Sequence, residues 1–142
     1  MSNIIKVSEA ASLALHTVVL LAAYPKRIFS TKEISSALHA SEAHLSKVLQ
    51  RLGKAGLVNS IRGPKGGFIL SRSKDEITLL EVYEAIDGPL GSSSCLFHTP
   101  VCGGRNCILG GLLSPVNQMV KNYLSKTKLS KLTSTFRQCN LE

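Results

Sequence analysis

The chain has 142 residues, of which 44% are hydrophobic and 18% are charged, and its formal net charge is +8. This balance excludes a disordered chain and favours one compact domain with an additional element. The longest uncharged apolar run, residues 10–24, is shorter than the roughly 20 residues of a membrane span, and the N-terminus lacks the pattern of a secretory signal. We therefore expect a cytoplasmic protein that has no membrane partner.

The positive charge lies in the first half of the chain. Residues 1–75 hold 11 Lys or Arg and 4 Asp or Glu, a net charge of +7, whereas residues 76–142 have a net charge of +1. Ordinary solubilising charge is the simple explanation. A half as basic as this one also attracts polyanions, most often nucleic acid.

The basic half predicts three helices. Residues 7–23 form an apolar helix with one narrow polar stripe, which indicates burial on most sides. A capping-box pattern starts a short helix over residues 31–38. Ser41 caps a further helix, which Gly56 closes. Because the linker between these last two helices is very short, they must turn sharply against each other, as in a helix-turn-helix.

A wing follows the helix-turn-helix. Two short strands, residues 57–61 and 68–70, are joined by a basic, glycine-rich turn. Thr78 then caps another helix with a second capping-box pattern, and that helix ends before Gly88. The predicted fold class is therefore mainly α with a small β-wing, a winged helix-turn-helix.

The remaining residues predict a loop and a C-terminal helix. Residues 89–106 are rich in Gly, Ser and Cys and have the character of a loop. Residues 107–124 carry apolar side chains at a spacing of three to four, which is typical of an amphipathic helix, although two glycines and a proline weaken its first turns. Residues 129–136 form one last short helix.

The order of a short basic helix and a basic wing is typical of DNA readers. A helix in the major groove reads base edges with residues near its N-terminus, and a wing presents cations to phosphate or to the minor groove. Arg51, one turn further along the helix, is expected to meet phosphate. Each residue alone is most often a solvated side chain, but the set favours DNA contact. The candidate DNA-binding residues are Ser41, Glu42, His44, Ser46, Lys47, Arg51, Arg62 and Lys65.

Three cysteines stand close together in the loop, at Cys95, Cys102 and Cys107. Because disulfides are disfavoured in the cytosol, this cluster favours a metal site, and soft thiolates suit zinc or an iron–sulfur cluster. The paired C-x2-C of zinc ribbons is missing, which counts against structural zinc. Free or redox-active thiols are the alternative. Cys139 lies in a polar tail, and we treat it as unrelated.

A cluster bound by three cysteines needs a fourth ligand. His98 lies within the loop itself. The polar stripe of the first helix, with Glu9, Ser12 and His16, is remote in sequence but could approach in space, for example from a partner subunit. We rank His16 and Glu9 above His98 because polar side chains on a buried helix are costly unless they have a partner.

The chain resembles the Rrf-two family of bacterial regulators, of the IscR/NsrR type. The resemblance spans nearly the whole chain and is strongest over residues 45–70, which match the pattern L-x-K-V-L-x-x-L-x-K-A-G-L-V-x-S-x-R-G-x-x-G-G-F-x-L. It continues in the sequence E-I-T-L at residues 76–79 and in the three cysteines.

This resemblance implies a winged-helix homodimer whose long helix after Cys107 crosses its partner. It divides the chain into a DNA-binding domain (1–88), a cluster-binding cysteine loop (89–106) and a dimerisation helix with a tail (107–142). It also implies an iron–sulfur cluster near the dimer interface, which we expect to be 2Fe–2S rather than 4Fe–4S, and binding to a palindromic operator in double-stranded DNA that depends on the cluster.

Two departures from the family pattern concern the fourth ligand. IscR-like members place a histidine three residues after the third cysteine, where this chain has Gly110, and NsrR-like members use an acid on the first helix, where this chain has Ser12. Some members use glutamate or histidine from the first helix, which keeps Glu9 and His16 as candidates. The motif Ser114-Pro115 is also expected to bend the long helix.

The expected function is that of a transcription regulator that senses redox state, nitric oxide or iron–sulfur status. The alternative is a regulator of the same fold without a cluster, which senses thiol oxidation, a metabolite or a protein partner. An enzyme is disfavoured, since the sequence has no nucleophile–base pair, phosphate-binding loop or paired carboxylates.

Overall fold

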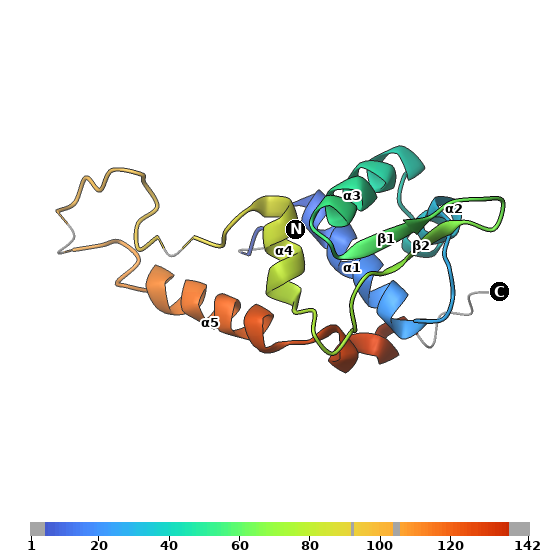
Figure 1. Cartoon of the computed structure of the whole chain (residues 1–142). Helices are drawn as coiled ribbons and strands as arrows, with labels where there is room; N and C mark the ends of the chain where they lie inside the picture. Colours follow the sequence, from blue (N-terminus) through green and yellow to red (C-terminus); the bar gives the residue numbers. More distant parts are fainter. Residues whose placement is uncertain (1–4, 92, 104–105, 137–142) are drawn as a thin grey trace.

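The computed structural model describes residues 5–91, 93–103 and 106–136. Three helices precede a two-stranded sheet, and a fourth helix, a long loop, a fifth helix and a short 3-10 helix follow it (Figure 1). The elements are α1 (Glu9–Ala23), α2 (Thr31–Leu38), α3 (Glu42–Lys54), β1 (Val58–Ile61), β2 (Gly67–Leu70), α4 (Leu79–Asp87), α5 (Leu113–Lys126) and η1 (Leu129–Phe136). The predicted fold class, a mainly α winged helix-turn-helix with a C-terminal helix, is confirmed.

Helix α1 lies at the centre of the core and packs against α3, α4 and η1. Its side chains are buried from Thr17 through Ala22, while its polar stripe remains accessible. The helix begins at Glu9 rather than at residue 7, because Ser8 is the N-cap and its Oγ accepts the N–H of Ala11 at 3.0 Å. The predicted burial on most sides is therefore confirmed, with a later start.

The helix-turn-helix forms as its caps predict. Ser30 and Glu33 make both hydrogen bonds of the capping box, and Ser41 Oγ accepts the N–H of His44 at 3.1 Å at the start of α3. The two helices are joined through His39, whose φ of 52° lies in the left-handed region. This backbone conformation produces the sharp turn that the short linker requires, and it sets α3 across α2.

The wing is an antiparallel pair in which Val58 faces Leu70 and Ile61 faces Gly67. Gly67 is needed because β2 also approaches the residues before α2 through a bridge between Phe29 and Phe68. A Cβ at Gly67 would stand 2.2 Å from the carbonyl oxygen of Phe29, closer than any real contact. The sheet therefore fixes the wing to the helix-turn-helix through a position that has no room for a side chain.

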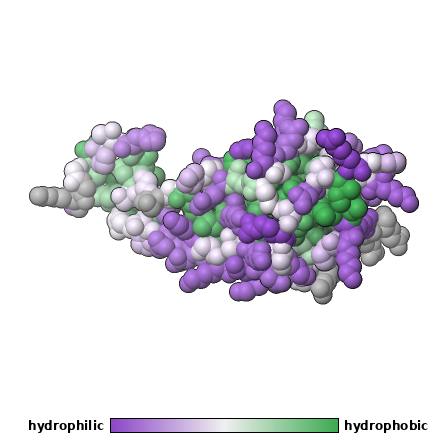
Figure 2. All heavy atoms as spheres, viewed as in Figure 1, coloured by the Kyte–Doolittle hydropathy of each residue, from purple (hydrophilic) through white to green (hydrophobic). Residues whose placement is uncertain are grey.

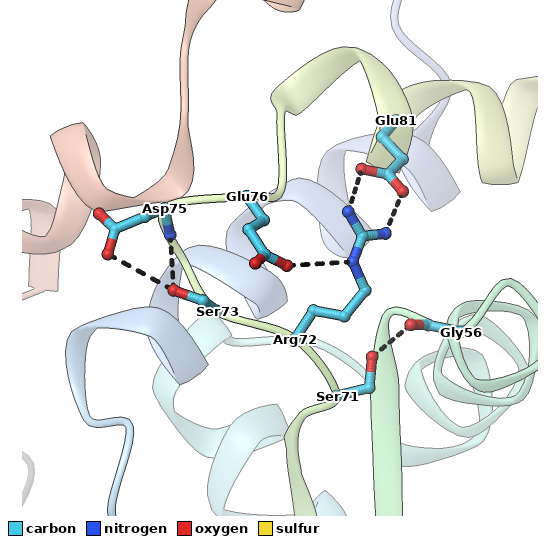
Figure 3. Close-up of polar contacts among 7 residues, drawn as sticks. All are labelled: Gly56, Ser71, Arg72, Ser73, Asp75, Glu76 and Glu81. Carbon is cyan, nitrogen blue, oxygen red and sulfur yellow. Dashed lines mark hydrogen bonds and ion pairs between the residues drawn. The ribbon is translucent and has the colours of Figure 1, made fainter.

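The second capping box is half formed. Thr78 Oγ1 accepts the N–H of Glu81 at 3.2 Å, as predicted, and α4 runs to Asp87. The Glu81 carboxylate, however, binds the Arg72 guanidinium (Figure 3), so it does not return to the backbone of the cap residue. The N-terminus of α4 is thereby connected to the segment that leaves the wing.

The C-terminal helix starts later than predicted. Residues 107–112 form turns, in which Gly110 and Gly111 have φ of 57° and 79°, and α5 begins only at Leu113. Pro115 consequently lies in the first turn of the helix, where a proline costs no hydrogen bond. The reason for expecting a bend at Ser114-Pro115 therefore does not apply. Residues 129–136 form a 3-10 helix rather than an α-helix.

The described residues of the loop, 88–91, 93–103 and 106–112, extend away from the body of the protein on the side opposite to the wing (Figure 1). Helix α5 returns along the base of the molecule toward η1, which packs on α1. In the described part of the chain, the helices are too short or too polar to cross a membrane.

Candidate nucleic-acid interface and cysteine loop

Helix α3 has one buried face and one exposed face. The buried face fixes the helix to the core with Leu45, Val48, Leu49 and Leu52. The opposite face carries the predicted base-reading residues, of which Ser41, Glu42, Ser46 and Lys47 are exposed and His44 is half-buried. The amphipathic spacing of α3 therefore brings these five residues together at the start and on the outer side of one helix, as a major-groove reader requires.

Two further candidates lie on the wing. Arg62 and Lys65 are exposed on either side of Pro64 in the turn between β1 and β2. Gly63 has a φ of 117°, and its carbonyl accepts the N–H of Gly66 at 2.9 Å. This closed turn places both cations at the tip of the wing.

Arg51, the expected phosphate contact, is exposed on α3 and also has a hydrogen-bond partner within its own chain. Its Nη2 donates a hydrogen bond to the backbone carbonyl of Ile86, in the last turn of α4. The guanidinium therefore binds a partner inside the protein, and it lies at the end of α4 where the helix dipole favours a cation.

The base of the wing is held by contacts that the sequence analysis did not identify (Figure 3). Arg72 Nη2 donates to Glu81 Oε2 at 3.3 Å, Nη1 binds the other oxygen of Glu81, and Nε lies 3.9 Å from Glu76. Ser71 Oγ donates to the carbonyl of Gly56, just after α3. The hydrogen bond to Glu81, and secondly the charge of Glu81, raise the pKa of Arg72, so this guanidinium stays charged. Residues 72–76 are not helical, so the i,i+4 spacing of Arg72 and Glu76 gives no sequence signal for this network.

The polar stripe of α1 faces the helix-turn-helix of its own chain. Glu9, Ser12 and His16 line an open groove of about 390 Å³, whose other wall comes from His39, Ser41 and His44. His16 Nδ1 donates to the carbonyl of Ser12 at 2.6 Å, which orients the ring and leaves Nε2 directed elsewhere. His39 was not a sequence candidate; its place in the turn between α2 and α3 is the feature that brings it here.

The three loop cysteines have free thiols. Cys95 and Cys107 are half-buried and Cys102 is exposed. The Sγ of Cys95 accepts the N–H of Phe97, and the Sγ of Cys107 accepts the N–H of Leu109, each at 3.4 Å. Three cysteine sulfurs are a donor set that suits a soft metal or a cluster. Among the described residues, however, no three His, Cys, Asp or Glu side chains converge on one point.

The candidate fourth ligands are not brought to the cysteines of the same chain. His98 is exposed within the loop. Glu9, Ser12 and His16 lie in the groove on α1, whereas the loop extends away from the body (Figure 1).

The end of α4, where the loop begins, is connected to α1. Ser8 Oγ donates to Asp87 Oδ1 at 2.5 Å, and the Ser8 N–H lies 3.4 Å from Oδ2. One turn earlier, burial and secondly the charge of Asp87 raise the pKa of Tyr83. Gly88, with a φ of 81°, then turns the chain into the loop.

The loop and α5 expose apolar side chains, and green patches appear on the lobe at the left of Figure 2, which the loop forms. Val101 is 81% exposed and Ile108 is 90% exposed, and in α5 Met119 is 71% exposed. None of the described side chains of α5 is buried. A groove of about 570 Å³ runs between α5, α4 and the segment before α1, and its walls are mostly apolar, including Val7, Leu15, Leu113, Val116, Met119, Val120 and Leu124. Apolar surface of this extent indicates an interaction site.

Residues 7–135 match the family model described as "Rrf2: Iron-dependent Transcriptional regulator". The chain belongs to the Rrf2 (Rrf-two) family. Among Rrf2 relatives, IscR of Photorhabdus laumondii is 31% identical over 102 residues, which are 72% of this chain and 62% of that protein. The putative regulator YwgB of Bacillus subtilis is 29% identical over 127 residues, 87% of this chain and 81% of its own length. The chain thus spans less than two thirds of the IscR relative.

Solved structures of Rrf2 regulators share the fold. CymR (YrzC), the global cysteine regulator of B. subtilis, superposes with a TM-score of 0.77 at 28% identity, covering 93% of this chain and 98% of CymR. IscR of T. potens has a TM-score of 0.72 at 23% identity, covering 96% and 91%, and shows the fold alone. The chain therefore has the winged-helix fold of a family of transcription regulators.

Proposed function

We propose that this chain is a homodimeric, cytoplasmic Rrf2 regulator that binds a palindromic operator and senses redox state, nitric oxide or iron–sulfur status through a 2Fe–2S cluster. The proposal assigns DNA binding to residues 1–88, the cluster to the loop within 89–106 together with Cys107, and dimerisation to 107–142. The observation that carries it is the position of Cys95, Cys102 and Cys107 in one exposed loop between the DNA-reading part and α5.

DNA reading is assigned to the exposed face of α3 and to the tip of the wing. Ser41, Glu42, His44, Ser46 and Lys47 would meet base edges and phosphates, and Arg62 and Lys65 would meet phosphate or the minor groove. The probe for the tests below is a duplex of about 30 base pairs, selected by the protein from a random library and long enough for two half-sites.

Replacing Lys47 by methionine is expected to weaken operator binding and its dependence on salt. A lysine that neutralises one phosphate releases condensed counterions, so its loss should reduce the slope of log K against log salt by about 0.9 for each protomer. The measurement is a salt titration by fluorescence anisotropy. Lys121→Met, on α5, is the control and should keep the slope. An unchanged slope in Lys47→Met would remove Lys47 from the interface.

A second copy of the chain is the proposed occupant of the apolar groove along α5. The groove is continuous with the exposed apolar side chains of α5, as a self-complementary dimer interface requires. A palindromic operator demands the two-fold symmetry that such a dimer provides.

Met119→Lys is expected to raise the dimer dissociation constant at least about tenfold, because dimerisation would bury an unpaired ammonium group. The folded protomer should be unaffected, since Met119 is 71% exposed. Sedimentation equilibrium measures the constant. Gln118→Lys introduces the same charge next to Met119 but outside the groove, and it should leave the dimer intact. Equal behaviour of the two variants would exclude this groove as the dimer interface.

The cluster is assigned to Cys95, Cys102 and Cys107 as thiolate ligands, and when bound it would supply a redox-active centre that oxidants and nitric oxide attack. Backbone N–H groups of Phe97 and Leu109 are directed at the sulfurs of Cys95 and Cys107. For the fourth ligand we propose His16, with Glu9, Ser12 and His98 as the alternatives. The hydrogen bond from His16 Nδ1 to a backbone carbonyl is the arrangement that prepares Nε2 for a metal, and the partner subunit's cysteine loop would have to approach it.

A cluster-free regulator is the second candidate. It is favoured by the separation of the thiols from the candidate fourth ligands within one chain, and by the similarity to the cysteine regulator CymR. An absorption spectrum of protein purified anaerobically, with iron and sulfide assays on the same sample, distinguishes the two. Broad absorption from thiolate-bound iron with stoichiometric sulfide supports the cluster, whereas a colourless, iron-free protein transfers sensing to the thiols, a metabolite or a partner.

A further inference from the structure

We infer that the C-terminal end of α4 is a joint that couples the cysteine loop to the recognition helix, and that Arg51 is the positioning residue of this joint rather than a phosphate contact. The coupling part of this inference rests on the proposed function, since it assumes that the loop carries the signal. The positioning of α3 by Arg51 does not.

Three elements meet at two consecutive residues of α4. Arg51 of α3 donates to the carbonyl of Ile86, and Ser8, the N-cap of α1, binds the carboxylate of Asp87. The next residue, Gly88, begins the loop. A displacement of the first residue of the loop, Gly88, is therefore one residue away from the hydrogen bonds to α1 and to the recognition helix.

The charges at this joint are complementary to the helix ends. A carboxylate on the last residue of a helix is unfavourable for that helix, because the dipole is negative there. Asp87 is nevertheless stabilised, because it lies at the positive N-terminus of α1 and accepts the Ser8 hydroxyl at 2.5 Å. Arg51 in turn places a cation at the negative end of α4. Each charged group thus stabilises a neighbouring helix. This complementarity indicates that the contacts contribute to the stability of the fold.

Replacement of Arg51 by methionine tests the inference, since it keeps the aliphatic stem and removes the donor. The wild type and the variants all carry Cys139→Ser, so that the loop thiols are the reactive ones. Binding of each protein to the selected duplex is measured before and after treatment with hydrogen peroxide, which attacks thiolates and clusters. Lys47→Met is the matched control. Two quantities are measured, the slope of log K against log salt and the ratio of the dissociation constants before and after oxidation.

Arg51→Met is expected to bind the duplex about tenfold more weakly, because one hydrogen bond from a charged donor is lost. Its salt slope should be unchanged. Its ratio of dissociation constants before and after oxidation should be close to one. Lys47→Met should show a smaller slope and the wild-type oxidation ratio. A slope that falls by about 0.9 for each protomer in Arg51→Met would make Arg51 a phosphate contact and overturn the inference.

The ratio of dissociation constants before and after oxidation tests the coupling separately. If Arg51→Met responds to oxidation as strongly as the wild type, the joint does not transmit the signal, although the proposed sensing stands. If the wild type itself does not respond, redox sensing by the loop is wrong and the coupling falls with it, while the salt slope still decides the role of Arg51. Should Arg51→Met fail to fold, Asp87→Asn, which weakens the contact to Ser8 without altering α3, is expected to reduce the oxidation ratio at an unchanged slope.

Discussion

The proposed cluster assignment predicts that replacing Cys102 by serine abolishes iron binding. Serine preserves the size of the side chain, but its hydroxyl is a poor ligand for cluster iron, and the two remaining thiolates do not hold a cluster. Iron and sulfide in the anaerobically purified variant should fall below about one tenth of the wild-type content, as measured by colorimetric assays and by absorption in the visible range.

Cys102 is the most direct position for this test because its side chain is exposed, so that the substitution leaves the fold unchanged. Cys139→Ser is the control and should retain the full iron content; this residue lies outside the described part of the chain. A variant at Cys102 that keeps its colour and its sulfide would remove Cys102 from the ligand set. Equal loss in both variants would point to general instability of the cluster instead.

Replacing Gly67 by alanine is expected to lower the free energy of unfolding by about 2–4 kcal/mol, because the added Cβ overlaps backbone atoms that cannot move independently of the core. The Cβ would lie 2.2 Å from the carbonyl oxygen of Phe29, and the Phe29 side chain is 1% exposed. Urea unfolding followed by circular dichroism, at a fixed protein concentration, measures the change.

Gly53→Ala is the matched control for this substitution. Gly53 lies within α3, and a Cβ there would meet only the carbonyl oxygen of Val58, at an ordinary 3.9 Å. Removing a helical glycine should therefore stabilise the protein by about 0.5–1 kcal/mol. If Gly67→Ala unfolds at the wild-type urea concentration, the close approach of the wing to Phe29 is not the reason for the glycine.

The helix-turn-helix and the wing are predictable because their signals are local. Ser30 with Glu33, Ser41 and Thr78 determine where helices begin, since each satisfies backbone donors within a few residues of itself. The late start of α5 was missed although its signal is also local, because the prediction gave the apolar spacing more weight than the glycines. The apolar spacing of residues 107–124 predicts a helix, but two consecutive glycines take up positive φ and prevent one.

The residues of the candidate site also divide into those that local patterns predict and those that tertiary packing places. The exposed face of α3 follows from the helical period, and the position of Arg62 and Lys65 follows from the turn. The hydrogen bond from Arg51 to Ile86 and the pairing of Arg72 with Glu81 connect residues that different elements bring together, so no short-range pattern could reveal them. The position of the α1 stripe beside His39 and His44, away from the cysteines, likewise depends on tertiary packing.

Helix α5 has a further consequence for local stability. A helix of this length has little stability of its own in water, and among the described residues none of its side chains is fully buried, although Leu124 packs against the core. Its opening therefore requires much less free energy than the opening of α1, most of which is buried. In an isolated protomer the cysteine loop therefore precedes a helix that opens more easily than α1, and dimerisation through α5 would supply the stability that this helix lacks.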